Sequence, residues 1–202
     1  MSLSKRQAER LITGLWYHKS SLSFLFSILF LPLSILYWLI TCCLRFLHER
    51  IRPSSLLLKE QSLPVIVVGN ISVGGTGKTP IIINLAKQLI EAGFQPAIIS
   101  RGYGGIASAS KNSVTPVFSD SDPGYCGEEP VLIAQSLKNV PVIIAASRAS
   151  AYLHVANTLD CNVVLSDDGL QHYQLPRSIE IAVIDSKQGL GNGLLIPSGP
   201  LR

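Results

Sequence analysis

The fold is decided by the stretch Val65-Ile-Val-Val68-Gly69-Asn-Ile-Ser-Val-Gly-Gly-Thr-Gly77-Lys78-Thr79-Pro80. An apolar strand, a glycine-rich loop and a helix opening on Lys-Thr-Pro follow one another in the order of a phosphate-binding loop. The glycines let backbone N–H groups turn towards phosphate oxygens without a Cβ clash. The positive N-terminus of the helix favours the same anion. The stretch therefore predicts a site for nucleotide phosphates, and an ordinary strand-to-helix turn is the alternative.

Side chains of the loop suit ATP and Mg²⁺ as cofactors. Lys78 can reach the β- and γ-phosphates, and Thr79 can hold the metal ion. One position departs from the usual pattern, because Ser72 stands where the first glycine of the loop is expected. The nucleotide-binding residues predicted from the loop are Gly74, Gly75, Gly77, Lys78 and Thr79.

Beyond residue 63 short apolar runs alternate with helical patterns. The runs at 65–68, 97–99, 140–145, 163–165 and 179–184 predict strands, and 79–92, 129–137 and 147–159 predict helices. This alternation indicates an α/β fold, a P-loop NTPase-like parallel sheet flanked by helices on both faces. The Ser- and Gly-rich region 106–125 is expected to be a loop around one short strand, Val117–Phe118.

Two carboxylates follow the apolar run at 163–165. Asp167 and Asp168 stand at the expected strand end, which is the place for an acid that binds Mg²⁺ directly or through water. Two adjacent acids are often only a solvated turn, but the phosphate loop favours the metal site. His172 follows a few residues later, and a structural role is favoured over a catalytic one.

Glu128 and Glu129 open another expected helix, and two interpretations stay open. The acids either complement the helix dipole or supply a general base and a Mg²⁺ partner. Arg148 opens the next helix after a strand, where it either clamps a phosphate or caps a solvated face.

The composition of the 202 residues indicates contact with a membrane. Hydrophobic residues make up 47% and charged residues 15%, against about 25% charged in soluble domains. The low share of charged residues argues against a disordered chain and against a coiled coil. Eight basic and three acidic residues fall in 1–63, against nine and ten in 64–202, so the net charge of +4 arises from the N-terminal part. An anionic membrane surface suits this pattern better than nucleic acid. The four cysteines lack the spacing of a zinc site.

The most apolar stretch, Ser21–Leu44, has 24 residues and no charge, which is enough for a membrane-spanning helix. Pro32 stands at its midpoint and is expected to kink or break a helix. Each half would be too short to cross alone. Basic residues are equally frequent on the two sides. A kinked span and a half-inserted anchor are therefore left as equal alternatives, and a cleaved signal peptide is not expected.

Taken together, the motifs resemble those of the tetraacyldisaccharide 4′-kinases, the lipid A 4′-kinases of Gram-negative bacteria. The similarity covers almost the whole chain and is carried by five motifs in order: 69–80, Ser100-Arg-Gly-Tyr-Gly104, Gly127-Glu-Glu-Pro130, Asp167-Asp-Gly-Leu-Gln-His172 and Asn192-Gly…Pro197-Ser-Gly-Pro-Leu-Arg202. The resemblance implies transfer of the ATP γ-phosphate to the 4′-hydroxyl of a tetraacylated glucosamine disaccharide 1-phosphate. It places the enzyme on the cytoplasmic face of the inner membrane, anchored through 21–44, with membrane lipid and the lipid substrate as partners. It implies no nucleic acid and no obligate protein partner.

The resemblance also implies roles for particular residues. Thr76 joins Lys78 and Thr79 as a phosphate-loop residue, and Arg148 and Arg202 correspond to phosphate-site arginines. Glu128 falls where the family usually has the aspartate proposed as catalytic base. Asp167, Asp168, Glu129 and Thr79 are the expected metal ligands. The histidine that assists the base lies in a later domain of the family.

The expected organisation is an N-terminal membrane-associating segment, 1–62, followed by a P-loop kinase domain, 63–202, as the first part of a longer kinase. Two alternatives remain. A membrane-associated dimerising ATPase would need its signature lysine at Val73. A non-catalytic ATP-binding membrane module would bind ATP without transferring phosphate.

Overall fold

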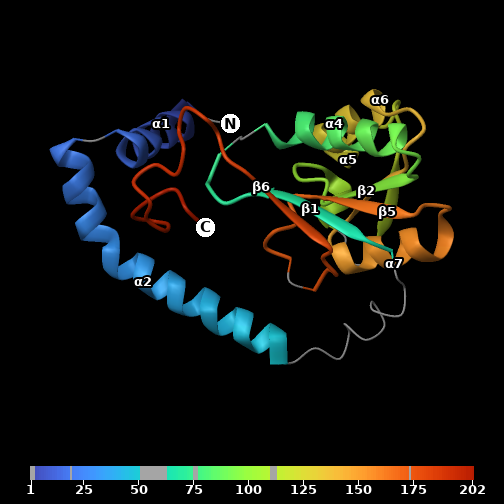
Figure 1. Cartoon of the computed structure of the whole chain (residues 1–202). Helices are drawn as coiled ribbons and strands as arrows, with labels where there is room; N and C mark the ends of the chain where they lie inside the picture. The colour runs from blue at the N-terminus through green and yellow to red at the C-terminus, as the bar shows by residue number, and fades with distance from the viewer. Residues whose placement is uncertain (1–2, 19, 51–62, 75–76, 110–112, 173) are drawn as a thin grey trace. The chain divides into compact units, whose positions relative to one another are not determined.

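The computed structural model describes residues 3–18, 20–50, 63–74, 77–109, 113–172 and 174–202, and these form two compact units (Figure 1). One unit comprises Met1–Ile51, Ile71–Thr76 and Ile184–Arg202, and the other comprises Arg52–Asn70 and Gly77–Val183. The domain boundary expected at residue 62 lies outside the described residues.

The second unit is built on a six-stranded sheet with the order β3-β4-β2-β5-β1-β6. The strands are β1 (Val65–Asn70), β2 (Pro96–Ser100), β3 (Val114–Val117), β4 (Val142–Ala145), β5 (Val163–Asp167) and β6 (Ile179–Val183). All neighbouring strands are parallel except β3 and β4. The predicted α/β class and its helix-flanked, largely parallel sheet are therefore confirmed.

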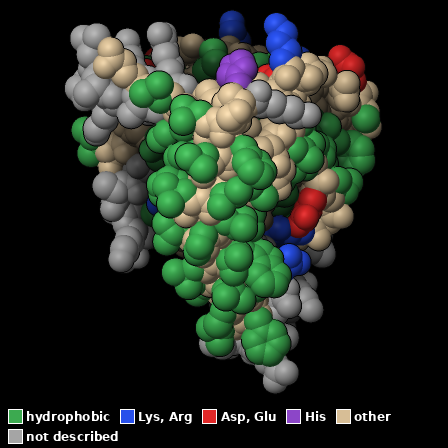
Figure 2. Space-filling view, turned by 90° about the vertical axis from the view of Figure 1, so that its left-hand side faces the viewer, with side chains coloured by type: hydrophobic (Ala, Val, Ile, Leu, Met, Phe, Trp, Pro, Cys, Tyr) green, Lys and Arg blue, Asp and Glu red, His purple; other side chains and the backbone are tan. Residues whose placement is uncertain are grey.

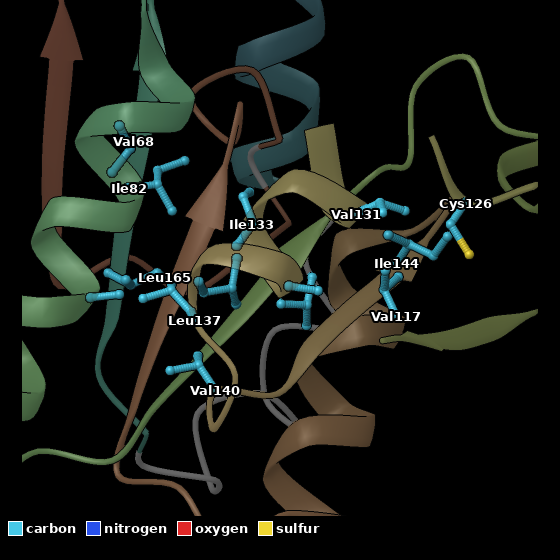
Figure 3. Packing of buried hydrophobic residues seen from close by; sticks show 14 of the residues in the cluster. Val68, Ile82, Val117, Cys126, Val131, Ile133, Leu137, Val140, Ile144 and Leu165 are labelled. Carbon is cyan, nitrogen blue, oxygen red and sulfur yellow. The ribbon is translucent and has the colours of Figure 1, made fainter. Parts of the chain in front are cut away.

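Helices cover both faces of this sheet. α4 (Lys78–Glu91) and α6 (Glu128–Ser136) lie over one face, and α7 (Arg148–Thr158) lies over the other (Figure 1). Successive residues of a strand point to opposite faces. Thus Val68 packs with Ile82 of α4 and Ile133 of α6 (Figure 3), whereas Val67 packs with Tyr152 of α7. Two buried layers fix the strand ends in place.

The region between β2 and α6 differs from the expectation. The short strand is Val114–Val117 rather than Val117–Phe118, and it runs antiparallel at the edge of the sheet. The region also contains the 3-10 turn η1 (Ile106–Ala109) and the short helix α5 (Pro123–Cys126). Only Val117 of β3 is fully buried, so the strand lacks the apolar run by which the interior strands were recognised.

The first unit contains two N-terminal helices, α1 (Leu3–Tyr17) and α2 (Ser21–Arg50). Of the two outcomes expected at Pro32, a kink or a break, the break is wrong, because α2 continues through the proline. A proline removes one backbone donor and leaves the other hydrogen bonds of a long helix in place. The 30 residues of α2 extend about 45 Å at the usual rise per residue.

α2 is the helix in the described part of the chain that is long and apolar enough to cross a membrane, over Ser21–Leu47 with a mean hydropathy of 2.1. Its leucines, isoleucines and aromatic residues are mostly exposed, as the hydrophobic side chains gathered in Figure 2 show. Three serines of α2 are buried instead: Ser23, Ser27 and Ser34.

Candidate functional site

Polar side chains gather at the carboxyl ends of three neighbouring strands of the second unit. β1 ends in Asn70, β2 in Ser100 and β5 in Asp167, and all three side chains are buried. β5 lies between the other two strands. The carboxyl ends of parallel strands are where α/β sheets bind ligands, so this edge is the candidate site.

Lys78 is the first residue of α4 and reaches across this edge. Gly77 before it adopts a left-handed conformation, with φ of 70°, which is strained for residues with a Cβ. The turn directs Lys78 Nζ to Asn70 Oδ1 at 3.1 Å and to Asp168 Oδ1 at 2.7 Å. The sequence-predicted lysine and one of the two predicted aspartates are thus in direct contact.

Asp167 is the buried acid of the site, with 2% of its surface exposed. Ser100 Oγ donates a hydrogen bond to its Oδ2 at 3.2 Å, while its Oδ1 is buried without a partner. Burial, and secondly the charge of Glu129, raise the pKa of Asp167 from 3.8 to about 6. An incompletely paired carboxylate in this position is ready to accept a cation or a proton.

Arg148 lies behind Asp167 at the start of α7 and is 3% exposed. Its Nη2 donates to the backbone carbonyl of Asp167 at 2.8 Å, and its Nε and Nη1 are buried without a hydrogen-bond partner. Burial lowers its pKa from 12.5 to about 10, although Asp167 and Asp168 act in the opposite direction. The alternative that Arg148 caps a solvated face is therefore wrong.

Glu128 and Glu129 form the first turn of α6, and both are exposed. Glu129 lies near enough to Asp167 for its charge to raise the pKa of that acid. Gly127 before them has a positive φ of 94°, and a Cβ there would meet the backbone of Gly102 and Tyr103. The position of Glu128 is compatible with both the dipole interpretation and the base interpretation.

The remaining predicted residues are placed as follows. Gly75 and Thr76 lie outside the described residues, and Thr79 is half-buried in the first turn of α4. Gly74 and Arg202 belong to the first unit. There, the backbone N–H of Arg202 donates to the carbonyl of Ile71 at 3.0 Å.

His172 is half-buried after the second acidic motif. Burial, and then the charges of Arg148 and Arg101, lower its pKa from 6.5 to about 4. The side chain is therefore neutral at physiological pH. The structural role favoured for His172 stays a prediction.

Sequence reasoning gave no role to Asn70 and Ser100, which orient Lys78 and Asp167. A signal was available, because each is a polar residue that ends an otherwise apolar strand. Among the described residues, no group of three or more His, Cys, Asp or Glu side chains is arranged as a metal site. Mg²⁺ commonly takes one or two carboxylates together with substrate phosphates.

Comparisons with known proteins match these features to one family. The sequence profile described as "LpxK: Tetraacyldisaccharide-1-P 4'-kinase" matches residues 26–202. A tetraacyldisaccharide 4′-kinase from Pasteurella multocida is 48% identical over 188 residues, which cover 93% of this chain and 54% of the relative. One from Mannheimia succiniciproducens is 44% identical over 189 residues, with coverage of 93% and 54%. The chain thus spans about half the length of these curated relatives.

A solved structure is also similar. The crystal structure of LpxK from Aquifex aeolicus in complex with ATP aligns with a TM-score of 0.68 at 31% identity, covering 87% of this chain and 54% of that one. The similarity includes both fold and sequence.

Proposed function

The chain belongs to the tetraacyldisaccharide-1-P 4′-kinase family, and from this we propose that it forms the ATP-binding part of a lipid kinase. The reaction is transfer of the ATP γ-phosphate to the 4′-hydroxyl of a tetraacylated glucosamine disaccharide 1-phosphate. The observation that carries the proposal is the position of Lys78, at a helix N-terminus, between the strand-end residues Asn70 and Asp168.

The phosphates of ATP are held by the N-terminus of α4 and by Lys78. The exposed N–H groups and the dipole of a helix start favour an anion, and Lys78 adds a full positive charge that can leave Asp168 for a phosphate oxygen. Gly74, Gly75, Thr76, Gly77 and Thr79 complete the loop in this proposal, and Arg148 and Arg202 serve as phosphate-site arginines. The ATP in the related Aquifex aeolicus structure supports ATP as the ligand.

Mg²⁺ fits the acidic side of the site. The buried Asp167 Oδ1 has no hydrogen-bond partner, and Glu129 raises the pKa of the same carboxyl. Carboxylate oxygens are the ligands that Mg²⁺ prefers. Asp167, with Asp168, Glu129 and Thr79, would hold the ion, which when bound would neutralise the phosphate charge that develops during transfer.

Phosphoryl transfer requires a hydroxyl that is positioned and then deprotonated. The 4′-oxygen forms a bond to the γ-phosphorus as the bond from that phosphorus to the β-phosphate oxygen breaks, and ADP leaves with the bonding electron pair. We assign Glu128 to accept the hydroxyl proton, because it is exposed at the start of α6 beside Glu129. A positioned carboxylate is the usual base in such a reaction.

We assign to α2 the role of attaching the kinase to the bilayer in which an acylated acceptor resides. Its exposed apolar side chains are suited to lipid, and the use of ATP puts the kinase on the cytoplasmic face of the inner membrane. A helix of this length can span the bilayer, and labelling of a cysteine introduced near residue 2 from the periplasmic side distinguishes a span from a half-inserted anchor.

The test is a transfer assay with γ-labelled ATP and the tetraacyldisaccharide 1-phosphate in mixed micelles, using the protein as expressed from its own gene. We expect Mg²⁺-dependent label in the lipid, which is lost in Lys78→Ala. Binding of ATP with no label in any lipid acceptor would favour a non-catalytic module and would refute the proposal.

A further inference from the structure

The serines of α2 form an inward polar face on an otherwise apolar helix. Ser23, Ser27 and Ser34 are 7, 9 and 4% exposed. They are four and seven residues apart and lie on one side of the helix. In a soluble helix the apolar side faces inward. The reversed arrangement of α2 indicates that its serine face has a specific partner inside the first unit.

That partner is the segment 192–202. Ser34 Oγ lies 2.9 Å from the carbonyl oxygen of Leu195 and 2.8 Å from Ser198 Oγ, and accepts a hydrogen bond from the backbone N–H of Ser198 at 3.0 Å. Ser198 is completely buried. One serine of the helix thus contacts the segment at two residues.

Ser27, two helical turns before Ser34, makes a second connection. Asn192 Nδ2 donates to Ser27 Oγ at 3.1 Å and to the carbonyl of Ser198 at 2.8 Å. α1 adds a third connection, because Trp16 Nε1 donates to the carbonyl of Pro197 at 3.0 Å. The segment is therefore held by side chains of both helices.

The opposite side of the same segment is bonded to the beginning of the phosphate loop. The backbone N–H of Val73 donates to the carbonyl of Pro200 at 2.8 Å, and Ser72 and Leu201 form an antiparallel bridge. Leu201 is in turn paired with Leu195, the residue whose carbonyl contacts Ser34. A continuous set of contacts thus runs from Ser34 through Leu195 and Leu201 to the loop.

The segment is too closely packed to shift freely between these two sides. Gly199 has no room for a side chain, since a Cβ there would clash with Asn192 Oδ1 and the carbonyl of Leu194. Closely packed elements transmit a displacement instead of absorbing it.

We propose that the serine face of α2 is a positioning site, in which Ser27 and Ser34 fix residues 71–73 of the phosphate loop through segment 192–202. The helix that offers its apolar side chains to lipid thereby also holds the loop. The inference rests on the proposed function only in taking this loop to bind nucleotide.

Hydrogen exchange at the Val73 amide tests the positioning directly. The variants are Ser34→Ala and Ser198→Ala, singly and together, with Ser21→Ala as a matched control, because Ser21 is exposed on the same helix. In detergent micelles, Ser34→Ala is expected to speed exchange at Val73 about fivefold, as for one lost hydrogen bond, with no change for the β1 core amides. The double variant should add little to either single one. Ser34→Thr, which keeps the hydroxyl, should restore slow exchange.

Binding of a fluorescent ATP analogue to the same variants measures the consequence. Ser34→Ala is expected to weaken binding severalfold, and Ser21→Ala to leave it unchanged. Equal Val73 exchange in Ser34→Ala and Ser21→Ala would overturn the proposal. If the parent protein binds no nucleotide, the proposed function fails, while the exchange measurement still decides whether the serine face positions the loop.

Discussion

Lys78 Nζ lies 2.7 Å from Asp168 Oδ1, so the cation of the phosphate loop is paired with a strand-end acid. The Lys78 side chain is 14% exposed and that of Asp168 is 44% exposed. An ion pair this accessible to water contributes only about 0–1 kcal/mol. A nucleotide phosphate can therefore replace Asp168 as the partner of Lys78 at a small cost in free energy, because it also accepts hydrogen bonds from the N–H groups at the start of α4.

Lys78→Ala is expected to abolish phosphoryl transfer and to weaken ATP binding by roughly 10- to 100-fold, since charge-assisted hydrogen bonds are worth that much. The fold should persist, because the ion pair contributes little to stability. Isothermal titration with ATP and a thermal melt measure the two effects. Lys87→Ala, an exposed lysine of the same helix, is the matched control, and normal turnover in Lys78→Ala would refute the phosphate-loop assignment.

Asp167→Asn is expected to stabilise the metal-free protein at pH 8 and to lose this advantage towards pH 4. The folded-state pKa of Asp167 is about 6 against an ordinary 3.8. The folded state therefore binds the proton more tightly than the unfolded state does. The buried, charged carboxylate of Asp167 destabilises the folded state above pH 6, and this destabilisation is relieved as the pH falls. The Tm difference between variant and parent, measured in EDTA from pH 4 to 8, checks this. A difference that does not change with pH would contradict the burial of a charged Asp167.

His172 is expected to affect the pH dependence of stability in the opposite direction. Its folded-state pKa is about 4 against 6.5, so the stability that its neutral form contributes is present above pH 6.5 and is lost as the pH falls towards 4. His172→Gln should therefore resist acid better than the parent across this range. The exposed His18 offers the control substitution His18→Gln, and identical acid profiles of parent and His172→Gln would count against a buried neutral imidazole.

The strands and helices of the second unit were predictable because each carries its own local signal. The run Val65–Val68 is apolar throughout because β1 is an interior strand, and Ile82, Leu85 and Leu89 face the core at helical spacing. β3 lacked such a signal because an edge strand buries one residue in four. Local patterns also cannot show that Ser34 meets Ser198, since that contact joins residues 164 positions apart.

The continuity of α2 through Pro32 shows that the local rule for proline does not decide between a kink and a break. The rule counts the lost donor and the steric clash of proline, but not the contacts of the flanking residues. Ser27 and Ser34, on either side of Pro32, are both hydrogen-bonded to segment 192–202. Long-range pairing also joins the segment that ends in Arg202 to the beginning of the phosphate loop. Sequence reasoning treated these two as separate motifs, because no local pattern shows that they pair.

Leu29→Asp is expected to reduce membrane binding strongly. Leu29 is 72% exposed on α2, and an aspartate at the centre of a membrane helix costs about 2.5–3.5 kcal/mol. Flotation with anionic vesicles measures the bound fraction. Leu132→Asp is the control, because Leu132 is 50% exposed on α6. Equal flotation of the two variants would mean that α2 does not enter the bilayer.

The two acids that open α6 are expected to differ in their effect on catalysis. Glu128→Gln should lower kcat by about 10²–10⁴, the usual worth of a general base, with little change in ATP affinity. Glu128→Asp should be tolerated, because it keeps the carboxylate. Glu129→Gln should instead alter the Mg²⁺ dependence and lower the pKa of Asp167, since the charge of Glu129 helps to raise that pKa.

If the acids only stabilise the helix start, their contribution is about 0.3–1 kcal/mol each. In that case Glu128→Gln would shift the Tm slightly and leave kcat alone. Both quantities are measured on the protein as expressed from its own gene, with saturating ATP and lipid acceptor. A lowered kcat at constant Tm identifies a group that acts on the reacting hydroxyl, because a helix cap can change the population of folded enzyme but not the rate of the folded enzyme. An unchanged kcat would remove Glu128 from the mechanism.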